Sequence, residues 1–216
     1  MALVIKGSSS GQVTLDVPAA AGTNTITIPA TTGTMLDTNS VIASNKLPTG
    51  SVIQTVSSTD NLSYSITVSS ATSDHAGSKA YTITPSSTSS SIVIHFTIPQ
   101  VKHSSGGGLR VRLYRDIGGA GYAHVSGLDG DSASNRQGGL FGNYDTNGDG
   151  NRSATTITGT VVDSPNTTSA VSYKFYFGTG DGTSADPIYV NRTQNDADFN
   201  YTHRTRTHVT LMEIAG

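Results

Sequence analysis

The run DTNGDG at residues 145–150 is the part of this sequence whose residue types and spacing come nearest to a metal site. Asp145, Asn147 and Asp149 occupy the first, third and fifth positions of a calcium-binding loop. The twelfth position, which would need a bidentate carboxylate, is Thr156. Asx and Gly residues also form tight turns without any metal. Two interpretations stay open, a calcium site at these three residues or a plain turn, and no other cofactor is expected.

The sequence offers little for catalysis. It contains no nucleophile elbow, no phosphate-binding loop and no dinucleotide-binding glycine pattern. The aspartates of residues 181–198 could supply a carboxylate pair for glycoside cleavage, but nothing in their Gly- and Asn-rich surroundings directs them toward one another. The six histidines show no compact metal-ligand spacing. We therefore expect a binding or structural protein rather than an enzyme, with a depolymerase as an alternative.

Aromatic and basic side chains are the candidates for ligand binding. Tyr122, Tyr144 and Tyr201 lie in loop-rich stretches and would stack on sugar rings, or would serve only in packing. The arginines at 110, 112, 204 and 206 alternate along predicted strands and would grip an acidic glycan or a neighbouring subunit, or lie on solvated faces. The long stretch at 116–152 is rich in Gly, Ser, Asn and Asp, so we expect a binding tip or an intersubunit arm there, the alternative being a loop decorated with short hairpins.

Composition narrows the class of protein that must position these residues. Only 13% of the 216 residues are charged, while Ser, Thr and 24 glycines are abundant. This composition favours strands and turns over helices. A net charge of −2 gives no field that would gather nucleic acid or an anionic membrane, and no apolar run is long enough for a signal peptide or a membrane span. We expect neither a nucleic-acid partner nor membrane insertion.

Short runs of Val, Ile, Thr and aromatic residues at period two, separated by turn clusters, predict nine strands. They cover residues 51–57, 62–68, 79–84, 91–98, 109–115, 154–163, 170–177, 187–191 and 207–214. Each of the stronger strands has one apolar face, which indicates an antiparallel β-sandwich. In the last strand both faces are largely apolar, so we expect this strand to be central in a sheet or buried at a subunit contact.

The first fifty residues have a different character. Alternating strands are predicted at 13–17 and 26–28, each ended by a proline, with small residues between them. Two-stranded ribbons are marginal in water, so this segment should gain partner surface by associating with other copies. We divide the chain into an N-terminal oligomerising segment, residues 1–50, and a sandwich domain, residues 51–216.

The segment GQVTLDVPAAAGTNTITIPATTGTML resembles a segment that recurs in tail-fibre and other virion proteins of tailed bacteriophages, particularly those of marine hosts. The closing HVTLMEIAG is similar to the C-termini of such proteins. The resemblance implies a virion structural protein, commonly a homotrimer. It further implies an N-terminal attachment or shaft segment and a jelly-roll-like antiparallel β-sandwich as the distal head.

The hypothesis is therefore an all-β, trimeric phage protein assembled in the host cytoplasm and located in the virion. Its N-terminal segment would contact other virion proteins, and its sandwich would recognise the host surface, with a polysaccharide as the expected ligand. Three alternatives stay open. One is a capsid decoration, cement or collar protein without receptor binding, the second is a cellular carbohydrate-binding module, and the third is the depolymerase named above.

Overall fold

The chain divides into two compact units, Met1–Val41 and Ile42–Gly216, which are described separately. The computed structural model describes residues 3–6, 8–15, 23, 42, 46–68, 73–104, 108–144, 154–179, 187–200 and 202–216. The turn at Pro48 and Gly50, where the sequence analysis placed its boundary, is part of the second unit. Within the described ranges no helix is long and apolar enough to cross a membrane.

In the first unit, β1 (Leu3–Lys6) and β2 (Gln12–Leu15) pair as an antiparallel hairpin. Gly11, at the start of β2, has a φ of 80°, a conformation that glycine adopts without strain. The predicted strand at 13–17 is found in part as β2, whereas β1 was missed because four residues are too few for an alternation to stand out. The predicted strand at 26–28 lies outside the described residues.

All nine strands predicted beyond residue 50 are present in the second unit. They are β3 (Val52–Asp60), β4 (Tyr64–Thr67), β6 (Tyr81–Ile83), β7 (Ser91–His103), β8 (Gly108–Ile117), β11 (Thr155–Asp163), β12 (Val171–Thr179), β13 (Pro187–Val190) and β14 (Thr207–Ile214). The sequence analysis missed three short strands and one turn of 3₁₀ helix. These are β5 (His75–Ala76), β9 (Ala123–His124), β10 (Phe141–Tyr144) and η2 (Ser126–Leu128).

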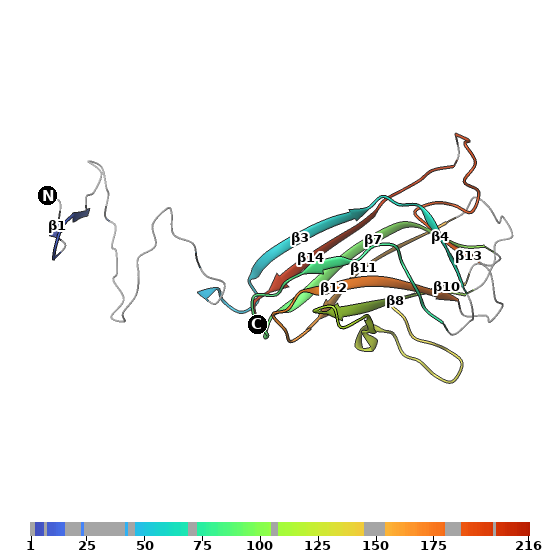
Figure 1. The fold of residues 1–216 in the computed structure, drawn as a ribbon, viewed down its shortest axis with the longest axis horizontal. Coiled ribbons are helices and arrows are strands. Elements are labelled where there is room, and N and C mark those ends of the chain that lie inside the picture. Colours follow the sequence, from blue (N-terminus) through green and yellow to red (C-terminus); the bar gives the residue numbers. More distant parts are fainter. Residues whose placement is uncertain are drawn as a thin grey trace. The chain divides into compact units, whose positions relative to one another are not determined.

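The strands form two antiparallel sheets (Figure 1). The first, which we call the β14 sheet, has the order β3-β14-β7-β13-β4, with β11 paired to β7. The second, the β8 sheet, has the order β10-β8-β12-β5, with β6 paired to β12 and β9 to β8. This arrangement confirms the predicted all-β, jelly-roll-like antiparallel sandwich. It also confirms that β14 is central, because β14 lies between β3 and β7.

The core lies between the two sheets and uses the faces that the alternation indicated. The buried side chains of β7 are Ile92, Ile94, Phe96 and Ile98, and those of β12 are Val171, Tyr173, Phe175 and Phe177. The rings of Phe96 and Phe175 join the two sheets with their centroids 4.8 Å apart. Burial of this apolar surface is the main stabilising contribution to the sandwich.

Candidate functional site

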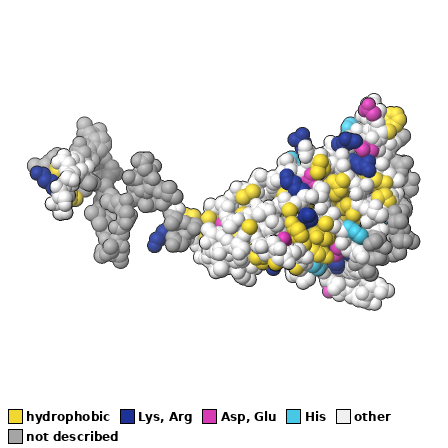
Figure 2. All heavy atoms as spheres, viewed as in Figure 1, with side chains coloured by type: hydrophobic (Ala, Val, Ile, Leu, Met, Phe, Trp, Pro, Cys, Tyr) yellow, Lys and Arg dark blue, Asp and Glu magenta, His cyan; other side chains and the backbone are white. Residues whose placement is uncertain are grey.

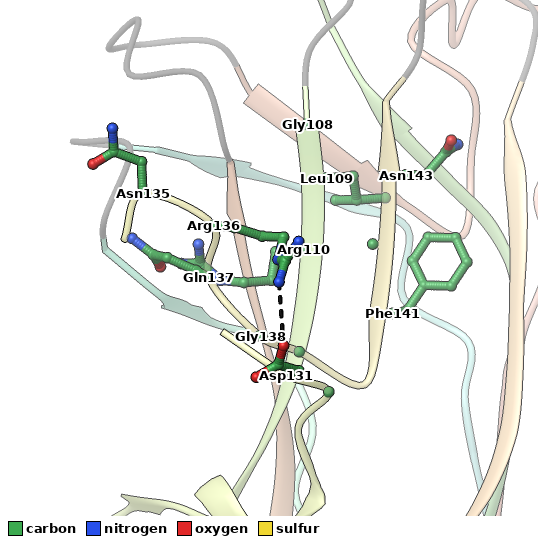
Figure 3. A pocket seen from close by; sticks show the side chains of 13 residues that line it. Gly108, Leu109, Arg110, Asp131, Asn135, Arg136, Gln137, Gly138, Phe141 and Asn143 are labelled. Atoms are coloured by element: carbon green, nitrogen blue, oxygen red, sulfur yellow. Dashed lines mark hydrogen bonds and ion pairs between the residues drawn. The ribbon is translucent and has the colours of Figure 1, made fainter. Parts of the chain in front are cut away.

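A cavity of about 390 Å³ opens where β8, β10 and the loop of residues 130–139 meet (Figure 3). Gly142 of β10 lies opposite Arg110 of β8, and both line the cavity floor. Phe141 and Asn143 point away from the loop in Figure 3. Phe141 does so because it pairs with Val111, whose side chain lies in the core. The cavity therefore has a floor of glycine and arginine and a polar wall.

Backbone hydrogen bonds hold this wall in place. Gly130 donates its N–H to the carbonyl of Gly139 at 3.1 Å, and Ala133 and Arg136 exchange two bonds at 3.0 and 2.9 Å. A Cβ atom on Gly138 would lie 2.2 Å from the carbonyl oxygen of Gly130, so only glycine permits this close approach. The 130–139 loop is thus a small hairpin-like wall and not a featureless connection.

The wall presents exposed side chains that could exchange hydrogen bonds with a ligand. Arg136 donates from Nη2 to Oδ2 of Asp131 at 3.2 Å, and both side chains are largely exposed. The side-chain amides of Asn135 and Gln137 are also exposed and have no hydrogen-bond partner among the described residues. The wall therefore offers donors and acceptors with no net charge.

Next to the cavity, the carboxylate of Asp74 accepts hydrogen bonds from three outward side chains of β8. Its Oδ1 accepts from Nη2 of Arg110 at 2.5 Å, and its Oδ2 accepts from Nη1 of Arg112 at 2.9 Å and from the hydroxyl of Tyr114 at 2.8 Å. Burial alone would raise the pKa of Asp74, but these three hydrogen bonds outweigh it and hold the pKa below its ordinary value. Burial and the bond to Asp74 together raise the pKa of Tyr114 to about 12.

An aromatic cluster continues the same face. The ring of Tyr114 stacks on Tyr176 at 3.8 Å and on His124 at 5.2 Å between centroids, and Tyr122 is tilted against Tyr176 at 6.2 Å. Nζ of Lys174 lies 4.9 Å from the ring centroid of Tyr122. Arg110 and Tyr114 are four residues apart on β8, which corresponds to roughly 14 Å along a strand. The cavity and the aromatic cluster thus form one elongated polar and aromatic face.

A second carboxylate ties the cluster to the cavity wall. Oδ2 of Asp129 lies 3.0 Å from Nε of Arg112 and 3.0 Å from Nε2 of His124. Nε of Arg112 also donates to the carbonyl of Gly138, at 2.9 Å. Asp74 and Asp129 therefore hold Arg110, Arg112 and His124 in place, and a ligand would meet a preorganised surface at this part of the face.

Of the predicted tyrosines and calcium ligands, the structure describes only Tyr122 in full. Tyr122 lies on the face just described, half-buried against Tyr176 and Lys174. Tyr144 ends β10, but its side chain lies outside the described residues, as do Tyr201 and the proposed calcium ligands Asp145, Asn147 and Asp149. These assignments stay predictions. Within the part of the chain that is described, no group of three or more His, Asp or Glu side chains is placed to hold a metal ion.

Only part of the arginine set follows a predicted arrangement. Arg110 and Arg112 lie in an almost buried ion-pair group with Asp74, with side chains only 7% and 15% exposed, and Arg112 also contacts Asp129 and the carbonyl of Gly138. Arg204 is 65% exposed and pairs with Asp196 at 2.8 Å, as expected for a solvated face. The sequence analysis missed Asp74, Asn135 and Gln137, although the last two lie in the stretch at 116–152 where it placed a binding tip.

No protein-family model matches the chain, and no curated protein matches it. Among solved structures, the chain is similar to the infectious bursal disease virus VP2 subviral particle, with a TM-score of 0.31, 13% identity and coverage of 75% of this chain and 38% of that one. It is also similar to the structure of the Gx strain of that virus, with a TM-score of 0.37, 15% identity and coverage of 97% and 44%. The chain thus spans less than half the length of these proteins.

Proposed function

We propose that this chain is a virion structural protein of the tailed-bacteriophage fibre type, a homotrimer whose sandwich binds a host-surface polysaccharide without cleaving it. The N-terminal segment would attach it to other virion proteins. The resemblance of residues 11–36 and 208–216 to phage virion proteins supports the class, and the all-β sandwich is compatible with it. The outer face of the β8 sheet is the observation that carries the proposed binding role.

The chemistry of this face favours a sugar chain as the ligand. Amide groups such as those of Asn135 and Gln137 exchange hydrogen bonds with hydroxyl groups, and the pairs of Arg136 with Asp131 and of Arg110 with Asp74 leave little net charge. A glycine floor lets a ligand approach the backbone closely. Tyr122 and its neighbours provide aromatic surface farther along. An elongated polyhydroxylated ligand would cover both ends of the face.

A trimer would make modest affinity sufficient. Three sites on one rigid particle raise the effective concentration for one another, so the overall avidity exceeds each single affinity by a factor of about 10² to 10⁴. A polysaccharide is a repeating ligand and suits this form of binding. The proposal therefore needs only weak contacts at each copy.

Binding of the full chain to an array of bacterial surface polysaccharides tests the proposal. We expect at least one polysaccharide to be retained, without release of reducing sugar. The double variant Asn135→Ala/Gln137→Ala should weaken retention by at least about tenfold, because it removes two hydrogen-bonding amides. Asn61→Ala, an exposed amide that does not line the cavity, serves as the matched control and should bind as the wild type does.

Three results would count against the proposal. Retention of no polysaccharide would leave the purely structural role of a decoration or collar protein. Equal retention of the double variant and the wild type would remove the cavity from the binding site. Release of reducing sugar would show that the protein is a depolymerase.

A further inference from the structure

The outer face of the β14 sheet differs in chemistry from that of the β8 sheet. Strands β3, β14, β7 and β11 pair in that order, and their register aligns outward side chains in three rows of four. The rows are Thr59, His208, Thr97 and Thr158; Ser57, Thr210, His95 and Thr160; and Thr55, Met212, Val93 and Val162. We call these twelve residues the threonine grid. None of them is Asp, Glu, Lys or Arg.

Hydroxyl groups of the grid hydrogen-bond to one another across the strands. Ser57 pairs with Thr210 at 3.0 Å, and Thr97 pairs with Thr158 at 3.2 Å. The ring Nδ1 of His95 lies 2.8 Å from Oγ1 of Thr160. Burial of a polar group costs less when its hydrogen bond is already made. Six of the nine polar side chains of the grid can therefore be covered by another surface at a small desolvation cost.

The third row adds apolar contact area. Val162 is 54% exposed, and Met212 and Val93 beside it are partly exposed. This row lies nearest to Val52, where the chain enters β3 from the segment that leads to the first unit. On the face of the second unit seen in Figure 2, charged side chains are few near this end and gather toward the opposite end.

We propose that the threonine grid packs against a second copy of this chain. The proposal rests on the homotrimer of the proposed function and names the surface by which its sandwiches meet. Interface cores are depleted of charged residues. Residues near a rotation axis lie close to their own copies, so a face with charges of one sign would repel its copy, whereas the grid contains no Asp, Glu, Lys or Arg. A foreign partner could instead be selected by complementary charge, which the grid lacks.

The size of the grid explains why this contact needs the N-terminal segment. At a strand spacing of about 4.8 Å and a row spacing of about 6.8 Å, the footprint of the grid is roughly 400 Å². A stable interface buries about 800 Å² on each partner. Association of the N-terminal segments would supply the remainder, and the covalent connection would raise the local concentration of the grids. Stiff β-branched threonines lose little side-chain entropy when they are covered.

Single cysteines test the proposal, because the natural chain contains none. We compare Thr160→Cys in the grid with Thr82→Cys on the outer face of the β8 sheet. The two positions are matched, since both are exposed threonines in strands and each hydroxyl has one cross-strand partner, at 2.8 and 2.7 Å. The measurement is the rate of maleimide labelling of the full chain in its native state, with circular dichroism and labelling in urea as controls.

We expect labelling at position 160 to be at least about tenfold slower than at position 82 in the native protein, and equal in urea, because coverage by a neighbouring copy lowers thiol access. Equal native rates would overturn the proposal. If light scattering then gave the mass of a trimer, the proposed interface alone would be wrong and the proposed trimer would be retained. A monomeric mass would overturn both the interface and the trimer. Loss of polysaccharide binding with labelling still slow would affect the proposed function alone.

Discussion

Glu213, the only glutamate in the chain, is a buried carboxylate that neighbouring polar groups stabilise by hydrogen bonds. Its side chain is fully buried on the inward face of β14. Oε1 accepts from the backbone N–H of Ser86 at 2.7 Å and from the hydroxyls of Ser86 and Ser90 at 2.8 and 2.7 Å, and Oε2 accepts from Gln54 at 2.6 Å. Burial alone would raise the pKa of Glu213, but these hydrogen bonds outweigh it and lower the pKa.

The replacement Glu213→Gln should reduce the free energy of unfolding by about 2 to 3 kcal/mol near neutral pH, because an NH₂ group would face donors that now meet a carboxylate. Since the folded pKa is lowered, the contribution of the carboxylate is present above the ordinary glutamate pKa and is lost as the pH falls through the folded pKa. Urea unfolding between about pH 7 and about pH 3 checks this. A difference between variant and wild type that stays constant over this range would contradict it.

At the scale of the elements, the pairing of β11 with β7 depends on a glycine. Gly159 lies opposite Phe96 in the ladder, and a Cβ atom at this position would come 2.9 Å from Cζ of Phe96. Phe96 is buried and packs against Phe175 of the other sheet, so its ring has little room to move. A glycine inside a strand commonly marks such a close approach.

Gly159→Ala should therefore lower the free energy of unfolding by about 1 to 3 kcal/mol through overpacking. Gly142→Ala in β10 is the matched control, because the nearest atom to its Cβ would lie at 3.9 Å, and this change should stay within about 0.5 kcal/mol. Urea unfolding midpoints of the two variants provide the comparison. Equal effects would contradict the prediction, because they would show that the ring of Phe96 moves aside without a cost in stability.

For the whole molecule, the division into two units has a direct consequence. Every residue of the hydrophobic core found among the described residues lies between Ile66 and Leu211, within the second unit. Deletion of residues 1–41 should therefore leave the sandwich folded, with a Tm within about 4 °C of its transition in the full chain. If the proposed trimer forms, the same deletion should abolish it, because the grid alone is smaller than a stable interface.

Circular dichroism and light scattering measure the two effects of the deletion separately. An unfolded product would mean that the first unit contributes to the core. A folded product that still forms a trimer would mean that the sandwich carries the whole interface. The two outcomes contradict different parts of the prediction.

Much of the fold follows from local chemistry. Alternation at period two is a property of a single strand, so nine strands and their buried faces could be predicted from neighbouring residues alone. For β14 the sequence left two places open, the centre of a sheet or a subunit contact, and the strand order shows the first. The two-residue strands β5 and β9 escaped prediction because they are too short to show a period. Composition singled out the stretch 116–152 as irregular, but it did not predict the hairpin-like wall at residues 130–139.

The amino-acid sequence by itself determined the all-β class, the strand positions and the face that each strand buries, because these depend on side-chain alternation and turn residues. Only the tertiary structure decided which strands are neighbours. It brought Asp74 onto Arg110, 36 positions away, and aligned four separate strands into an uncharged face. The physical reason is that such contacts form only when distant segments are closed into one core, and no local pattern specifies that closure.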